Sequence, residues 1–296
     1  MRTGARFWFH FLLVLVMAPP ALAPAAERRP AGKFTKGECI QCHARRDTKL
    51  VAAWRASGHA RTSPKADCLA CHGATHTGSL AQARRDGACV ACHEKLNRAV
   101  THSYATSKHA TIVKLEADQW DWSRPLARGN YRAPGCAYCH LHGAEHDTRL
   151  SITPWDPFQT SIESAQEATL GRRQLVCGDC HAPRYVAEQT GTGERMQEIA
   201  RMKLREARAV MTRYQGALSA EDRHELDTLF TGMQAHGHNV RLGVGHQSPD
   251  YQWWHGQPAL DGDLLRIKGL IAEQERRVLA GRARSATGGN SRAGQR

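Results

Sequence analysis

The chain has 296 residues, a formal net charge of +13, 41% hydrophobic residues and 6% aromatic residues. Leucine, isoleucine, valine and phenylalanine make up only about 17% of it, a share that is typical of disorder in a chain of this charge. The composition therefore excludes a folded domain with an ordinary aliphatic core, and something else must hold the fold together.

The N-terminus predicts export. Arg2 and Arg6 precede an apolar run over residues 7–18, and a stretch of small residues follows it. This order is typical of a secretory signal peptide, which we place at residues 1–26. The apolar run spans about 12 residues, whereas a helix that crosses a bilayer needs ~20. We therefore expect a periplasmic protein, and an uncleaved membrane anchor is the alternative.

All the cysteines belong to five Cys-x-x-Cys-His pentapeptides. This spacing is typical of c-type heme attachment, in which two thiols bond to the porphyrin and the adjacent histidine binds the iron. A zinc site does not need a histidine after every cysteine pair, and a redox dithiol needs only one such pair. We therefore expect five covalently attached heme c groups. The attaching cysteines are Cys39, Cys42, Cys68, Cys71, Cys89, Cys92, Cys136, Cys139, Cys177 and Cys180, and the proximal ligands are His43, His72, His93, His140 and His181.

Five hemes would explain both the composition and the charge. Large apolar porphyrins can replace the missing aliphatic side chains, and the short spacing between the motifs requires the hemes to pack closely. Two propionates on each heme would offset roughly ten positive charges. The basic balance therefore compensates for the cofactors, and we do not expect nucleic acid as a partner.

The second axial ligand decides between electron transfer and catalysis, because catalysis needs an open position on the iron. His59 and His109 both stand in a Ser-x-His-Ala context beyond a heme motif. His76 and His146 closely follow the second and fourth motifs, so that short loops could return them over a ring. We predict all four as distal ligands.

A helical region is predicted after the last motif. Apolar residues at mostly helical spacing predict a helix over 192–218, a second one over 219–236 and a third over 261–280. His238 and His246 lie in the Gly- and His-rich interruption and complete the predicted distal ligands. The expected regions are a pentaheme domain at 33–190, a helical region that supplies distal ligands at 191–280 and a disordered basic tail at 281–296.

Three stretches, in order, resemble the later part of hydroxylamine oxidoreductase and its multiheme relatives. They are "YRAPGCAYCHLHGAEHD" (131–147), "CGDCHAPRYVAEQ" (177–189) and "HNVRLGVGHQSPDYQWWHG" (238–256). The region 39–110 is similar to the wider superfamily, which includes pentaheme nitrite reductases and tetrathionate reductases. The resemblance implies a mainly α fold, with a loop-rich multiheme core and a C-terminal helical tail that is often used for oligomerisation.

The chain departs from these relatives in its catalytic signatures. Hydroxylamine oxidoreductases carry eight heme motifs and a late tyrosine that cross-links to the catalytic heme, whereas this chain has five motifs and no tyrosine after Tyr251. It also has no Cys-x-x-Cys-Lys motif, the mark of many pentaheme nitrite reductases. Both catalytic signatures are therefore absent. Beyond the five proximal histidines and His10, eleven histidines remain for five second ligand positions, and this surplus favours an electron carrier over an enzyme.

We therefore expect a periplasmic cytochrome that passes electrons through closely packed, mostly bis-histidine hemes. Its partners would be redox proteins, such as a cytochrome or a quinol-side donor or acceptor, and further copies of itself through the C-terminal helices. The alternative is an oxidoreductase that acts on a small nitrogen or sulfur compound, of the hydroxylamine, nitrite or tetrathionate type, at one five-coordinate heme. In that case Tyr138, His142 or Asp147 could handle protons.

Overall fold

The computed structural model describes residues 30–63, 65–124, 131–152, 155–158 and 163–290. The predicted signal peptide at 1–26 lies outside these ranges. Within them, no helix has both the length and the apolar character that crossing a bilayer requires. Every regular element in the described ranges is a helix, which confirms the mainly α fold.

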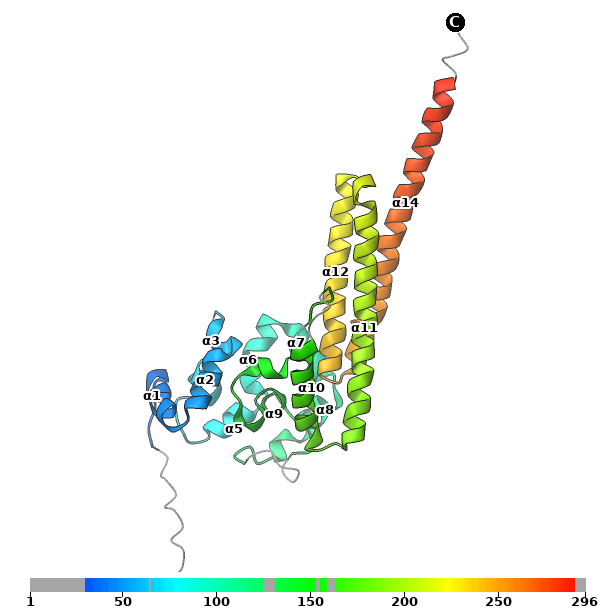
Figure 1. Cartoon of the computed structure of the whole chain (residues 1–296). Coiled ribbons are helices and arrows are strands. Elements are labelled where there is room, and N and C mark those ends of the chain that lie inside the picture. Colours follow the sequence, from blue (N-terminus) through cyan, green and yellow to red (C-terminus); the bar gives the residue numbers. More distant parts are fainter. Residues whose placement is uncertain (1–29, 64, 125–130, 153–154, 159–162, 291–296) are drawn as a thin grey trace, which may run out of the picture.

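The N-terminal part consists of short helices joined by loops (Figure 1). The helices are α1 (Lys36–Arg46), α2 (Thr48–Ala56), α3 (Gly58–Arg61), α4 (Cys68–His72), α5 (Ser79–Arg84), α6 (Gly87–Leu96), α7 (Arg98–Ala105), α8 (Lys108–Glu116), α9 (Cys136–His140) and α10 (Glu163–Gly178), with the 3-10 turns η1 (Ala117–Gln119), η2 (His142–Ala144) and η3 (Thr148–Ser151). Helices α1 to α9 are too short to be stable alone, so packing against neighbours must hold them.

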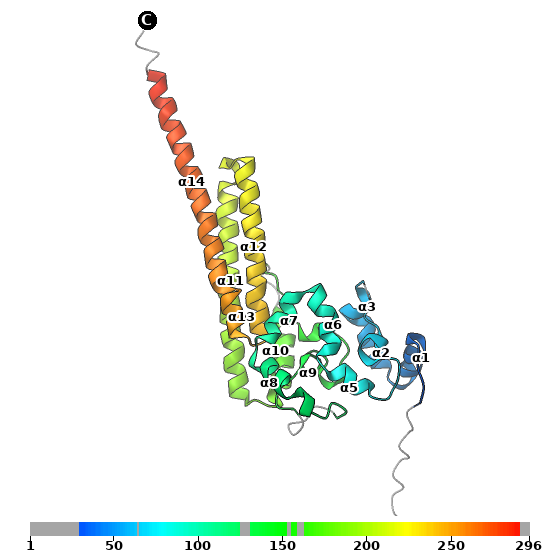
Figure 2. The same ribbon diagram turned by 180° about the vertical axis from the view of Figure 1, so that it is seen from behind.

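Three long helices form a bundle on one side of this part (Figures 1 and 2). They are α11 (Pro183–Tyr214), α12 (Ala220–Gly245) and α14 (Gln257–Asn290), and each packs against the other two. The turn η4 (Gln215–Ala217) joins α11 to α12, and the short helix α13 (Pro249–Trp254) joins α12 to α14.

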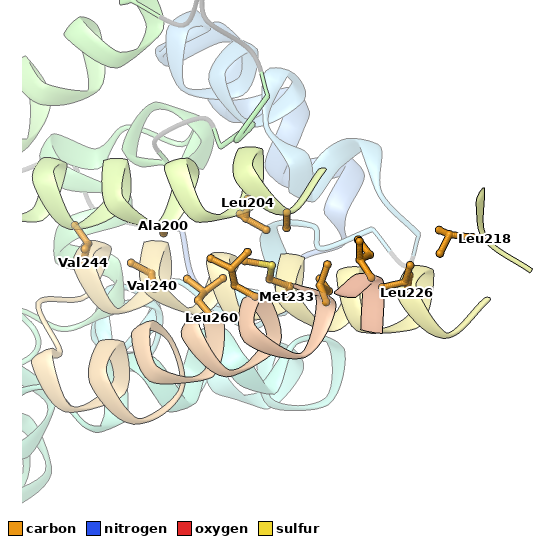
Figure 3. Close-up of a cluster of buried hydrophobic side chains, with 12 residues drawn as sticks. Ala200, Leu204, Leu218, Leu226, Met233, Val240, Val244 and Leu260 are labelled. Atoms are coloured by element: carbon orange, nitrogen blue, oxygen red, sulfur yellow. The ribbon is translucent and has the colours of Figure 1, made fainter. Parts of the chain in front are cut away.

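The aliphatic core of the described chain lies in the bundle and not among the heme motifs. Figure 3 shows this cluster, in which Leu204 of α11, Met233 of α12 and Leu260 of α14 are fully buried. Leu260, Leu264, Ile267 and Ile271 follow the four- and three-residue spacing of one helix face. The bundle thus has an ordinary aliphatic core, contrary to the expectation from the composition of the whole chain, because the aliphatic residues gather in α11, α12 and α14. The short helices depend on another source of packing.

Helix α12 continues past His236 to Gly245, into the interruption that the sequence predicts there. Its glycines allow close packing and do not end the helix. A Cβ on Gly237 would lie 2.7 Å from Leu204 Cδ1, and a Cβ on Gly243 would lie 2.8 Å from the backbone nitrogen of Gln252. The predicted end near His236 is therefore wrong, because tertiary contacts override the low helix propensity of glycine.

Helix α14 also exceeds its predicted range of 261–280 at both ends. Residues 281–290 are helical, contrary to the predicted disorder, and their alanines and arginines are good helix formers. Residues 291–296 of the predicted tail lie outside the described ranges. In Figures 1 and 2 the C-terminal end of α14 extends past the ends of α11 and α12.

Candidate heme sites

Each Cys-x-x-Cys-His motif presents its thiols from a helical turn. Four motifs lie within helices α1, α4, α6 and α9, and the fifth begins at the end of α10. There the backbone N–H of His181 donates to Cys177 O at 2.9 Å, so the turn continues through the motif. The two cysteines of each motif are three residues apart, so their thiols lie on one side of the helical turn. All the cysteines are free thiols, as thioether bonds to heme require, and none forms a disulfide.

Each proximal histidine faces a second histidine. The ring centroids of the five couples are 6.1–6.4 Å apart. A metal–imidazole bond of about 2 Å on each side, added to the half-widths of the two rings, gives a separation of this size. The residues therefore fit a bis-histidine iron. The couples are His43–His76, His72–His146, His93–His59, His140–His246 and His181–His109.

Buried serines position His59 and His109. Ser57 and Ser107 are the N-cap residues of α3 and α8, and each histidine is the second residue of its helix. The Ser107 hydroxyl accepts from the backbone N–H of Ala110 at 3.1 Å, whereas the Ser57 hydroxyl donates to Trp54 O at 2.7 Å. The repeated Ser-x-His-Ala context is therefore a helix start that aims its histidine at a proximal partner.

Backbone carbonyls orient His76 and His146. Nδ1 of His76 lies 3.2 Å from Pro30 O, and Nδ1 of His146 lies 2.7 Å from Ala144 O. Because a carbonyl oxygen only accepts, each Nδ1 carries the proton and Nε2 is free to bind a metal. Both histidines serve motifs other than the one that they follow in the chain: His76 faces His43, and His146 faces His72.

His246 ends helix α12 and is the only predicted ligand from the bundle that reaches a proximal histidine within the described ranges. It is the C-cap residue, and the N–H of Ser248 donates to Gly243 O at 2.8 Å, as in a Schellman motif. Burial lowers the pKa of His246 to about 4, and the nearby His140 contributes in the same direction. The ring is therefore neutral near pH 7, which is the form that binds a metal.

His238 occupies a different position from the one that the sequence predicts. It lies within α12, two turns before His246, and it has no ring contact with a proximal histidine in the described part of the chain. Burial and then Arg241 lower the pKa of His238. The structure thus brings together five of the six predicted distal ligands with the five proximal ones.

The first three motifs are neighbours in space. Helix α4 packs against both α1 and α6. Burial raises the pKa of Cys68, and the nearby thiol of Cys39 raises it further. Burial likewise raises the pKa of Cys71, and Cys89 and Cys92 add to the effect. The second motif therefore lies between the first and the third.

The last three motifs continue the same series. The thiols of Cys89 and Cys136 share a hydrogen bond, which lowers the pKa of Cys89 and raises that of Cys136. Burial raises the pKa of Cys139 to about 12, with Cys177 as the next cause. The spatial order of the five motifs is therefore their order in the sequence.

Two aspartates that the sequence analysis missed join neighbouring motifs. Asp86 Oδ1 accepts from the backbone N–H of Cys136 at 2.7 Å, which ties the start of α6 to the start of α9. Asp179 accepts a hydrogen bond from the Tyr138 hydroxyl and lies 3.5 Å from Nε2 of His142. No local pattern marks either aspartate, because each partner is distant in the sequence.

The residues proposed to handle protons in the enzyme alternative are only partly brought together. The rings of Tyr138 and His142 lie 5.1 Å apart. Asp147 is engaged elsewhere, because its carboxylate forms an ion pair with Arg149 at 2.6 Å. That arginine lowers the pKa of Asp147, so the carboxylate is a weak proton acceptor near neutral pH.

Comparisons with known proteins identify the chain as a multiheme cytochrome. The family model "Seven times multi-haem cytochrome CxxCH" matches residues 43–218. A probable nitrite reductase–hydroxylamine oxidoreductase fusion protein from Kuenenia stuttgartiensis is 32% identical over 81 residues, which are 26% of this chain and 10% of that protein. This match confirms the predicted resemblance, although the chain spans only a tenth of that relative's length.

A similar solved structure comes from the same organism. It is a chain of a reducing HAO-like protein complex, with 15% sequence identity and a TM-score of 0.49. The similarity covers 85% of this chain and 87% of that chain.

Proposed function

The chain belongs to the multi-haem cytochrome CxxCH family, and we propose that it is a pentaheme c-type cytochrome that transfers electrons. Family membership establishes covalently attached heme c and heme-based electron transfer. The number of hemes and their ligands are the proposal. The observation that carries it is that each of the five motif histidines faces a second histidine at 6.1–6.4 Å between ring centroids.

A heme c held at each couple would supply reversible one-electron exchange. The two histidines of each couple would hold such a heme, and the protein's part is to keep both imidazoles neutral. Burial is the largest cause that lowers the pKa of His59, His72, His109 and His140, and a neighbouring histidine adds to it in each case. Protonation would remove the ligand, so the lowering of these pKa values supports stable ligation at neutral pH.

The linear order of the motifs supports transfer along the chain. Neighbouring motifs lie side by side from α1 at one end to α10 at the other, and Figure 1 shows α1 far from the bundle. We therefore expect electrons to enter near one end of the series and leave near the other. Redox proteins, such as a cytochrome or a quinol-side donor or acceptor, would dock there, in the periplasm that the N-terminal signal-like sequence predicts.

The enzyme alternative requires one iron with an open axial position. Each of the five proximal histidines faces another imidazole. This favours a carrier over an oxidoreductase that acts on hydroxylamine, nitrite or tetrathionate.

Mass spectrometry and spectroscopy of the purified protein test the proposal. We expect five covalent hemes per chain, a ferric protein in which every heme is low-spin, and a ferrous protein that does not bind carbon monoxide. Replacement of Cys177 and Cys180 by serine should remove one heme from the measured mass. Fewer than five hemes, or one heme per chain that is high-spin and binds carbon monoxide, would contradict the proposal.

The end of α14 is also proposed as the contact with a second copy of the chain. Val278 and Leu279 are exposed, and the C-terminal end of α14 extends past the ends of α11 and α12 (Figure 1). Burial of exposed apolar side chains on association is favourable, which supports this contact. Light scattering should show an oligomer that Leu279→Glu dissociates. Leu265→Glu, on the part of α14 that packs in the bundle, is the control. A monomeric wild-type protein would refute this contact.

A further inference from the structure

We propose that Ser103 is a positioning residue that holds His246 on the iron opposite His140 and sets the donor strength of that imidazole. The inference rests on the proposed bis-histidine function, which it deepens at one site. Ser103 lies in α7 with an exposed fraction of 0%, and its hydroxyl oxygen is 2.7 Å from His246 Nδ1.

The hydrogen bonds of Ser103 assign the proton on His246. The Ser103 hydroxyl has one proton, and it donates that proton to Val100 O at 2.9 Å. The oxygen must therefore accept from His246, so Nδ1 of the imidazole carries its proton. The other nitrogen, Nε2, is then deprotonated and available to the metal. The reverse arrangement would place a proton on Nε2 and prevent ligation.

His246 needs this support because it comes from a different part of the fold. The other four paired distal histidines lie between residues 59 and 146, among the short helices, whereas His246 ends a helix of the bundle. The next residue, Gln247, has a φ of 55°, a conformation that non-glycine residues adopt at some cost. Ser103 thus forms a direct hydrogen bond that joins α7 to His246, the distal ligand that comes from the bundle.

The contact differs in kind from those at other sites. His76 and His146 donate to backbone carbonyls, which a side-chain substitution cannot remove. His246 donates to a hydroxyl that is polarised by its own bond to Val100 O. Loss of that hydroxyl would leave a buried N–H without an acceptor and would release the orientation of the ring. Removing such a partner of a ligating histidine typically weakens metal binding about 10–100-fold.

The test compares three variants of the heme-loaded, full-length protein. Ser103→Ala removes the acceptor, and Ser103→Thr restores a hydroxyl. Thr106→Val is the matched control, because Thr106 bonds to Ser248 at 2.7 Å in the same contact between α7 and the end of α12 but does not touch an imidazole. Carbon monoxide binding and the midpoint potentials of all hemes are measured for each variant, with circular dichroism as the check of folding.

We expect Ser103→Ala to bind carbon monoxide at one heme per chain, whereas the wild type binds none, because loss of this partner weakens the His246–iron bond about 10–100-fold. One midpoint potential should become more positive, because a less electron-rich imidazole stabilises ferric iron less. Ser103→Thr and Thr106→Val should match the wild type. The inference is overturned if folded Ser103→Ala has wild-type carbon monoxide binding and potentials, or if Thr106→Val shows the same changes.

This result is separate from the test of the proposed function. A wild-type protein with a carbon monoxide-binding or high-spin heme would overturn the bis-histidine function whatever Ser103 does. A fully low-spin wild type with an unaltered Ser103→Ala variant would overturn only the role of Ser103.

Discussion

Gly135, directly before the fourth heme motif, can become alanine only if the Asp86 carboxylate moves. An alanine Cβ would overlap Asp86 Oδ1 and lie 3.2 Å from its Cγ. The backbone itself does not oppose the change, because φ −89° and ψ −175° at Gly135 are open to any residue. Asp86 Oδ1 accepts from the N–H of Cys136 at 2.7 Å and so caps α9, whose own N-cap glycine has no side chain.

Gly135→Ala and Asp86→Ala therefore both remove the hydrogen bond to the Cys136 N–H, and Asp86→Ala also removes the Asp86 contact with Tyr104. A hydrogen bond to a charged group contributes about 1.5–3 kcal/mol, and loss of an N-cap costs roughly 0.5–2 kcal/mol. We expect each single variant to lower the free energy of unfolding by about 2 kcal/mol. The double variant should also lose about 2 kcal/mol rather than 4, because the added methyl group then fills open space.

Thermal unfolding of the heme-loaded wild type, the two single variants and the double variant, followed by circular dichroism, measures these losses of stability. A loss of 1 kcal/mol lowers Tm by roughly 2–4 °C for chains of this size, so each single variant should fall by about 4–8 °C. Asp86→Asn should keep most of the stability, because its amide oxygen can still accept from Cys136. Additive losses in the double variant would refute the reasoning, since Gly135 would then act independently of Asp86.

Three further predictions concern the ligands and the end of α12. The imidazole planes of His72 and His146 cross at only 20°, whereas the planes of the other couples cross at 45–69°. One heme should therefore give a rhombic low-spin EPR signal that is lost in a His146→Ala variant. Equivalent signals from all hemes would contradict this prediction. His246→Ala should create one high-spin heme per chain while His238→Ala creates none, and the opposite outcome in the ferric absorption spectrum would reverse our assignment. Gln247→Gly should raise the free energy of unfolding by roughly 0.5–1 kcal/mol in chemical unfolding, because glycine adopts a φ of 55° without strain. No gain would mean that the Gln247 side chain makes a compensating contact.

Some features of the sites could be predicted from short stretches of sequence because the chemistry is local. Heme attachment needs two thiols and a histidine within five consecutive residues, so the motif is complete in the sequence. The Ser-x-His-Ala context marked His59 and His109, since an N-cap serine and a histidine two residues later form within a single helical turn. The apolar spacing likewise predicted the three long helices.

The pairing of the ligands could not be predicted, because it depends on contacts between distant segments. His146 follows the fourth motif but faces His72 of the second, and His246 reaches His140 from the bundle. His238 and His246 stand in the same Gly-rich stretch of sequence. They separate only because Gly237 and Gly243 pack closely and extend α12, which leaves His238 inside the helix and His246 at its end.

The sequence by itself thus determined the cofactor and the helical class and predicted the attachment residues, since these follow from covalent spacing and periodicity. Tertiary structure alone decided which histidines face each other and which aspartates join neighbouring sites. It also decided that the motifs lie in space in the order of the chain. The physical reason is that each of these contacts joins separate segments of the chain. A couple of histidines, or the hydrogen bond by which Asp86 caps the helix that starts at Cys136, forms only when those segments pack together.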